Sequence, residues 1–297
     1  MQKTILQRKS FLLRARRHAL SLGASTRIMG IINMTPDSFS QDGCISIGGK
    51  GKGPDTAIRK ALTFIRQGAD IIDIGGESSR PGAKRIPLKE ELARVIPVIK
   101  ALAQKVDNPI SVDTYKPLVA RHALDAGASI VNTIMGTSPD RRLLKMVQHY
   151  EAAVILMHMR GTPRTMQNNI VYNNLITEIK DSLQKSLEIC LEIGIKSDRI
   201  ILDPGIGFGK TAEHNLEIIN RLNEFQSLRC PLLIGTSRKS FIGKVLREDV
   251  PRQRTWGTAA TVCASILKGA HILRVHDVKE MIAVARMTDA IINQSFI

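Results

Sequence analysis

Short apolar runs alternate with longer segments of helical periodicity from residue 28 to the end of the chain. The runs show no alternation of apolar and polar positions, which is typical of parallel strands that are buried on both faces. Eight such runs occur, at residues 28–32, 71–74, 109–112, 129–131, 153–157, 200–202, 231–234 and 271–275. They predict eight parallel strands.

The segments between these runs predict helices that each present one apolar stripe to the strands. The clearest stripes are Leu88, Leu92, Val95, Ile99 and Leu102; Ile176, Ile179, Leu183 and Cys190; and Met281, Ile282, Ala285 and Ile292. Pro97 lies within the first stripe and predicts a kink or a break there. Eight strands that are each followed by a helix indicate an α/β protein, a (β/α)8 TIM barrel, with a doubly wound open sheet as the alternative.

Residues 28–297 are interpreted as a single barrel domain, because no linker, low-complexity segment or change of composition divides them. Residues 1–27 form a short basic N-terminal extension, since they are rich in Lys and Arg and the first acidic residue of the chain is Asp37. Such a leader can be an organellar transit peptide. A strand-bearing extension is favoured, because no small-residue cleavage site is evident and the tract runs directly into the first strand.

Composition limits the classes of protein that fit. No stretch approaches the roughly 18 uncharged apolar residues of a membrane span, so no membrane partner is expected. The cysteines (Cys44, Cys190, Cys230 and Cys263) form no C-x-x-C pair, which argues against a zinc site or a disulfide framework and fits a cytoplasmic protein. The net charge of +16 indicates either a nucleic-acid surface or a site for anionic small molecules. The second is favoured, because only 4% of the residues are aromatic and no nucleic-acid module is recognisable.

Polar residues follow all eight predicted strands. In a barrel these strand ends share one face, and functional side chains gather there. In chain order the strand ends carry Asn33; Asp73 and the segment 75–82; Asp113; Asn132; His158 and Arg160; Asp203; Ser237 and the segment 238–240; and Arg274, His276 and Asp277. Any one of them can be a simple helix cap: Asp113 is open to this interpretation, and we expect Asp277 to cap the last helix.

Two kinds of chemistry are represented at this face. Asp113, Asn132, Asp203 and Lys239 suit a flat heterocycle, because a carboxylate can accept two parallel hydrogen bonds from an amino-amidine edge. A second set is directed at anions and lies where barrel enzymes often hold phosphate. It consists of Arg80, Ser237, Arg238, Arg274 and His276. Asn33 supplies an oxygen that could hold Mg2+ together with water and phosphate oxygens.

This inventory indicates a transferase in which an anionic group leaves a bound heterocycle. No nucleophile elbow, H-E-x-x-H motif or pair of acids spaced for glycoside hydrolysis occurs in the chain. Stabilisation of the leaving group by Arg274, His276 and a metal ion is then the main catalytic effect. A Schiff base on Lys239 is the competing chemical interpretation.

The glycine-rich segment ILDPGIGFGK, residues 201–210, fits neither a phosphate-binding loop nor a dinucleotide fingerprint, because Pro204 and Lys210 stand where glycines are needed. Its glycines leave room for a ligand to approach the backbone. Asp203 is interpreted as a ligand-binding acid at the end of a strand. Lys210 is expected to be a solvated side chain at the start of the next helix.

Six motifs together resemble those of dihydropteroate synthase. They are MGIINMTPDSFS from Met29, DIGGESSRPG from Asp73, SVDT from Ser111, LDPGIGFGK from Leu202, SRKS from Ser237 and RVHDV from Arg274. The resemblance covers nearly all of residues 28–290. It implies a (β/α)8 barrel that condenses p-aminobenzoate with 6-hydroxymethyl-7,8-dihydropterin diphosphate, releases diphosphate with Mg2+ bound, and serves folate biosynthesis. It further implies a homodimer formed through the last helices and a target of sulfonamides.

The resemblance also implies roles for residues that match the motifs. The pterin would contact Asp113, Asn132, Met157, Asp203, Gly235 and Lys239. The diphosphate would contact Asn33, Arg80, Arg274 and His276, with Asn33 also at the metal. The p-aminobenzoate pocket would consist of Ser79, Arg80, Pro81, Phe208, Lys239 and Ser240, and the catalytic set of Lys239, Arg274, His276 and Arg80.

Three positions depart from the pattern of this family: Gln41 precedes Asp42 in the first loop, Ser79 replaces a common threonine, and Thr133 replaces a frequent aspartate after Asn132. The implied mechanism is dissociative: diphosphate leaves first, and the first and second loops close over the pterin cation before the amine attacks. The alternatives are a pterin-binding module without synthase activity, such as part of a corrinoid methyltransferase or a silent paralogue, and a basic RNA-binding protein.

Overall fold

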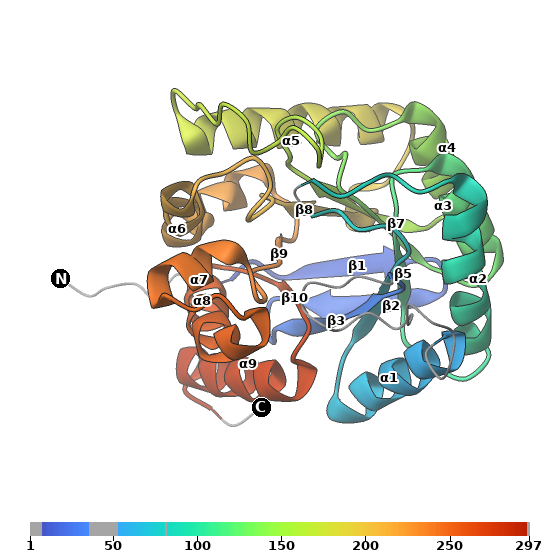
Figure 1. The fold of residues 1–297 in the computed structure, drawn as a ribbon, viewed down its shortest axis with the longest axis horizontal. Helices are drawn as coiled ribbons and strands as arrows, with labels where there is room; N and C mark the ends of the chain where they lie inside the picture. Colours follow the sequence, from blue (N-terminus) through green and yellow to red (C-terminus); the bar gives the residue numbers. More distant parts are fainter. Residues whose placement is uncertain (1–7, 36–52, 81, 296–297) are drawn as a thin grey trace.

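A closed barrel of eight parallel strands forms the centre of the molecule (Figure 1). The computed structural model describes residues 8–35, 53–80 and 82–295. The barrel strands are β3 (Arg27–Asn33), β4 (Ile71–Gly75), β5 (Ile110–Asp113), β6 (Ile130–Thr133), β7 (Ala153–Met157), β8 (Ile200–Asp203), β9 (Leu233–Ile234) and β10 (Ile272–Val275). Their order is β8-β7-β6-β5-β4-β3-β10-β9, and a parallel bridge between Leu202 and Leu232 closes the ring. The (β/α)8 barrel predicted from the sequence is therefore confirmed.

Helices surround the strands (Figure 1). They are α1 (Pro54–Gln67), α2 (Leu88–Ala103), α3 (Pro117–Asp125), α4 (Arg141–His149), α5 (Leu175–Glu192), α6 (Ala212–Asn220), α7 (Ser240–Leu246), α8 (Thr255–Leu267) and α9 (Val278–Asn293). Three short 3-10 helices, η1 (Ser197–Arg199), η2 (Leu222–Leu228) and η3 (Pro251–Arg254), lie between them. None of the described helices combines the length and apolar character that a membrane span requires.

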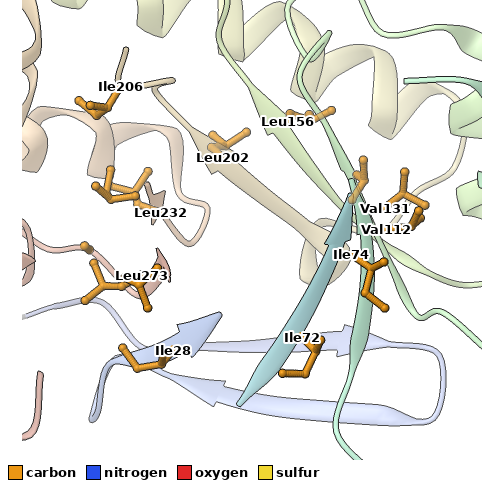
Figure 2. Close-up of a cluster of buried hydrophobic side chains, with 14 of the residues drawn as sticks. Ile28, Ile72, Ile74, Val112, Val131, Leu156, Leu202, Ile206, Leu232 and Leu273 are labelled. Carbon is orange, nitrogen blue, oxygen red and sulfur yellow. The ribbon is translucent and has the colours of Figure 1, made fainter. Parts of the chain in front are cut away.

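The barrel strands are covered by apolar side chains on both faces, as their uninterrupted apolar sequences predict. Outward-facing residues such as Ile72, Val131 and Leu202 pack against the helices, and Figure 2 shows part of this layer. Inward-facing residues such as Met29 and Ile155 form a second, smaller cluster inside the barrel. Packing on both faces thus fixes the strands, and because they are parallel their carboxyl ends lie at the same end of the barrel.

An antiparallel hairpin precedes the barrel. Its strands are β1 (Phe11–Ala15) and β2 (His18–Leu22), and Leu13, Ala15 and Leu22 join the inner cluster. Arg8, just before the hairpin, is buried and donates a hydrogen bond of 2.5 Å to Asp289 of α9. The residues described in the basic extension therefore pack against the barrel.

A kink or a break was predicted at Pro97; helix α2 continues through this residue, so the chain does not break there. Pro97 is exposed, while Val95, Val98 and Ile99 beside it are buried against the core. A proline removes one helical hydrogen bond, and burial of the apolar stripe on both sides compensates for that loss.

Candidate active site

A cavity of about 390 Å³ opens at the carboxyl ends of the barrel strands. Every site residue expected from the sequence that the structure describes lines this cavity. These residues are Asn33, Ser79, Arg80, Asp113, Asn132, Met157, Asp203, Phe208, Gly235, Lys239, Ser240, Arg274 and His276. Pro81 lies outside the described residues. The structure therefore brings together side chains that are distributed over most of the chain.

Arg274 of β10 is held between two carboxylates. Its Nε donates to Asp73 Oδ2 at 2.7 Å, and its Nη2 donates to Asp113 Oδ2 at 2.8 Å. Although burial opposes the charged form, Asp73 and Asp113 raise the pKa of the Arg274 guanidinium. The guanidinium is thus held in its charged form and fixed in direction at the cavity wall.

Asp73 holds two of the lining residues, Arg274 and Asn132, and the sequence assigned it no role. It lies on β4, is fully buried, and also accepts a hydrogen bond from Asn132 Nδ2 at 3.3 Å. Its second oxygen has no hydrogen-bond partner among the described atoms. The sequence does carry a signal for Asp73, which is a carboxylate inside an otherwise apolar strand. Such an acid is buried only when a cation or several hydrogen-bond donors compensate its charge.

Burial also sets the charge states of the two carboxyl groups expected to bind the heterocycle. It raises the pKa of Asp113 above its usual value, although Arg274 opposes this shift. It raises the pKa of Asp203 to about 6, and Asp203 Oδ1 accepts the backbone N–H of Gly205 at 2.7 Å. Both acids face a cavity with little bulk water, where a ligand with a complementary donor edge is favoured.

Lys239 lines the same cavity as these acids. Burial and then Arg274 lower its pKa to about 8, and its Nζ lies 4.0 Å from the centre of the Phe208 ring. This is a cation–π contact that holds the lysine and the aromatic ring together. The pair can form one wall for a flat aromatic ligand.

A second group of donors surrounds His276. Burial lowers the pKa of His276 well below its usual value, so the ring is neutral, and Ser237 Oγ lies 3.0 Å from its Nδ1. Arg238 donates from Nε to Asp277 Oδ2 at 3.0 Å. Asp277 occupies the N-cap position of α9 without making a side-chain cap, so the predicted capping role is wrong. Its carboxylate pairs with a guanidinium instead, which is a stronger interaction than a cap.

Arg254 of η3 is a further lining residue that the sequence did not indicate. It is buried and donates to the backbone oxygens of Glu248, Asp249 and Arg238. Because these partners are backbone groups on both sides of α7, no pattern of side chains in the sequence indicates them.

Lys210 is buried, with only 3% of its surface exposed, so the expectation of a solvated side chain is wrong. Its Nζ lies 3.0 Å from His158 Nδ1 and donates to Phe208 O at 3.0 Å. Gly205 has a φ of +72°, and a Cβ at this residue would lie 1.9 Å from His158 O. A glycine here therefore lets the loop approach the segment that follows β7. The turn therefore carries the lysine inward.

Glu77 lines the cavity at the start of the β4–α2 segment. Tyr115 donates its hydroxyl to Glu77 Oε1 at 2.8 Å, and Lys116 bridges Glu77 and Glu91 at 2.6 and 2.7 Å. Glu91 is buried and also accepts from Thr114 at 2.7 Å. This network fixes the base of the segment that carries Ser79 and Arg80.

The departures from the family pattern lie partly within the described residues. Thr133 is buried and accepts the backbone N–H of Met135 at 3.3 Å, so its hydroxyl supports the turn after β6. Ser79 lines the cavity. Gln41 and Asp42 lie outside the described residues.

Residues 29–276 match the family described as pterin binding enzyme. The chain is 48% identical to the dihydropteroate synthase of Synechocystis over 269 residues, which cover 91% of each chain. It is similar to the Yersinia pestis dihydropteroate synthase crystallised with a sulfonamide drug complex, with a TM-score of 0.89 and 39% identity over 96% of this chain and all of the other. It also resembles the Clostridium difficile dihydropteroate synthase determined with pteroic acid, with a TM-score of 0.83 and 46% identity over 91% and 98% of the two chains.

Proposed function

This chain belongs to the dihydropteroate synthase family, the enzymes of folate biosynthesis that join p-aminobenzoate to a dihydropterin diphosphate, and we propose which of its residues hold each reactant. One observation carries the proposal: the carboxylates of Asp113 and Asp203 and the cations Lys239 and Arg274 line a single cavity, and Arg274 is fixed there by Asp73 and Asp113. Such an arrangement suits a substrate that has hydrogen-bond donors on one edge and an anionic leaving group at the other end.

The pterin lies at the bottom of the cavity in this proposal. Asp203 and Asp113 accept hydrogen bonds from its donor edge, Asn132 supplies an amide, and Lys239 donates to the ring from the opposite wall. Met157 and Gly235 line the flat space between them. Asp203 is well placed because its carboxylate is buried and one of its oxygens is already fixed by Gly205.

The diphosphate lies at the mouth of the cavity. Arg274, His276, Arg80 and Asn33 contact it, and Ser237 Oγ supports the His276 ring. As the bond to the diphosphate breaks, negative charge grows on the leaving oxygen, and the fixed guanidinium of Arg274 favours that state more than the ground state.

The amine substrate, p-aminobenzoate, lies in front of the pterin, between the β4–α2 segment and the glycine-rich loop. Phe208 and Lys239 form one wall for the ring of p-aminobenzoate, and Ser79, Arg80, Pro81 and Ser240 complete the pocket. The neutral amine attacks the pterin methylene carbon after diphosphate departs, and the proton that it loses passes to solvent or to the departing anion. A deep cavity excludes competing water from the cation.

Mg2+ is part of the proposed reaction. No group of three or more His, Cys, Asp and Glu residues suited to a metal exists among the described residues. The donor set nevertheless fits Mg2+, because this ion keeps several waters and binds mainly through substrate phosphates, so that Asn33 alone is an adequate protein ligand. When bound, it would supply additional positive charge at the leaving group.

Further features of the proposal concern the whole protein. We also propose a homodimer that forms through the last helices, and a cytoplasmic location. The chain is divided into an extension of residues 1–27 and a barrel domain of residues 28–297. The free thiols of Cys190, Cys230 and Cys263 support a reducing compartment.

A direct assay tests the proposal. Purified protein, incubated with the pterin diphosphate, p-aminobenzoate and Mg2+, is expected to release diphosphate and form dihydropteroate. Folded protein that binds the pterin but gives no turnover would contradict the proposed roles and favour a pterin-binding module. Arg274→Ala is expected to slow turnover at least about a hundredfold, in the range found when one transition-state donor is removed.

A further inference from the structure

Lys210 is a buried lysine for which the proposed reaction has no use. It lies at the end of the glycine-rich loop, immediately before α6, and 3% of it is exposed. Burying a lysine is costly unless its donors are satisfied, and an apolar side chain would fill the same space without that cost. The contacts of this lysine should therefore explain its presence.

Three acceptors surround the Lys210 ammonium group. His158 Nδ1 and Phe208 O lie at 3.0 Å, and His158 O lies at 3.4 Å. Burial lowers the pKa of Lys210 to about 7, although Asp203 opposes this shift. In its ammonium form the group has three N–H donors and no acceptor, so His158 Nδ1 accepts, which places the ring proton on Nε2. Burial lowers the pKa of His158 to about 2, so that the ring is neutral, as this contact requires. The number of donors thus equals the number of acceptors.

These contacts connect two segments that leave adjacent strands. His158 follows β7, and its N–H donates to the backbone oxygen of Asp203 at the end of β8. The glycine-rich loop approaches the same segment so closely that a Cβ on Gly209 would lie 2.9 Å from Arg160 O. Tyr172 closes the far side by donating its hydroxyl to Gly209 O at 3.0 Å.

The groups beside the lysine are those to which the proposed function assigns the substrates. Phe208, whose backbone oxygen binds Lys210, carries the ring that contacts Lys239. Gly205, at the other end of the loop, donates to the Asp203 carboxylate. The positive charge of Lys210 also opposes the rise in the pKa of Asp203 that burial causes.

We propose that Lys210 is a positioning residue: by tying the glycine-rich loop to His158, it sets Asp203 against the pterin and Phe208 against Lys239. The proposal rests on the proposed function, since it needs a pterin in the cavity. Without the ammonium group, Phe208 O and His158 Nδ1 lose their shared donor, and the glycines on either side of Phe208 allow the loop to move.

Lys210→Met tests this role by calorimetric titration with two probes. The affinity for 6-hydroxymethylpterin is expected to fall at least about tenfold, as for the loss of a charged hydrogen-bond donor. The affinity for inorganic diphosphate with Mg2+ should stay within about twofold, because its proposed contacts lie on other elements. The KM for p-aminobenzoate should rise as well.

Two further variants define the outcome. Arg8→Met removes a buried cation at the opposite end of the barrel and should lower stability with no change in pterin affinity. Lys210→Gln retains an amide donor and should recover part of the lost affinity; it also carries the test if the methionine variant does not fold. Unchanged pterin affinity in folded Lys210 variants, or an equal loss for both probes, overturns the inference. Wild-type protein that fails to bind the pterin overturns the proposed function instead.

Discussion

At the scale of the residue, the site depends on charges that are buried in compensating sets. Arg274 has Asp73 and Asp113, and Lys210 has three uncharged acceptors. A group in such a set cannot turn toward solvent without leaving its partners unsatisfied. Its direction is therefore already fixed before a ligand arrives, which lowers the cost of binding and of charge stabilisation.

Asp73→Asn should weaken the fixation of Arg274. Removing one partner of a buried pair typically costs about 3 kcal/mol of stability, and the freed guanidinium should also slow diphosphate departure. Denaturant unfolding and steady-state kinetics measure the two effects. Asp70→Asn is the matched control, because Asp70 pairs with Arg27 outside the cavity. The interpretation fails if both variants have the same kcat.

Pterin binding should depend on pH through Asp203. Both oxygens of the Asp203 carboxyl group are free of a proton and able to accept only when the group is ionised. Burial raises its pKa to about 6, although the hydrogen bond from Gly205 and the charges of Lys239, Lys210 and Arg274 oppose this shift. Affinity is therefore expected to weaken as the pH falls through 6 and to level off above 7. Calorimetry with 6-hydroxymethylpterin across this range measures the profile. The Asp203→Asn variant should bind the pterin more weakly over the whole pH range and show no change in affinity near pH 6. A change in affinity that comes from the titration of Asp113 should persist in this variant.

Sequence reasoning identified the ligand-facing residues better than the residues that hold them. Asp113 and Asp203 could be placed because parallel strands align their carboxyl ends. Lys210 and Asp277 were misjudged, since their partners His158 and Arg238 come from other loops. Such pairings depend on how a loop turns, and a single sequence carries no direct signal of that.

At the scale of the element, the strands were predictable and the segments between them less so. All eight barrel strands lie where the apolar runs occur. Between β9 and β10, however, the chain forms α7, η3 and α8 rather than one helix. The continuation of α2 through Pro97 likewise depends on packing, which outweighs local propensity.

Lys116 anchors an element in the same manner. Lys116→Met leaves Glu77 and the buried Glu91 without their cation and should lower stability by about 3 kcal/mol. The β4–α2 segment should then exchange its amide hydrogens faster, and the KM for p-aminobenzoate should rise. Hydrogen exchange with mass spectrometry and kinetics provide the measurements. Lys145→Met, at an exposed position on α4, is the control. Unchanged amide exchange of the β4–α2 segment in Lys116→Met contradicts this role.

At the scale of the whole molecule, apolar side chains remain exposed on the last helices. Trp256 and Leu267 of α8, and Met287 and Ile291 of α9, are exposed to 83%, 47%, 63% and 58%. Met287 and Ile291 are four residues apart and share one helical face. Exposed apolar side chains on one helical face are available for association with another protein surface, which supports the proposed homodimer.

A charged residue on that face should weaken the dimer. Wild-type protein is expected to sediment at twice the chain mass of 32.8 kDa, and Ile291→Asp should shift it toward the monomer. Analytical ultracentrifugation over a range of concentrations measures the equilibrium. Leu118→Asp, at an exposed position on α3, is the control. A wild-type monomer at all concentrations contradicts the proposed assembly.

The hairpin that fills the lower end of the barrel has a consequence for synthesis on the ribosome. Arg8 pairs with Asp289, which lies 281 residues later in the chain, and Leu13 and Leu22 pack against strands that extend to β10. This hairpin is thus synthesised long before the strand β10 and the helix α9 that cover it. Contacts of such sequence separation form slowly, and exposed strand edges promote aggregation meanwhile. Many basic residues lie around this hairpin, and their charge favours the solubility of the hairpin until the rest of the barrel covers it.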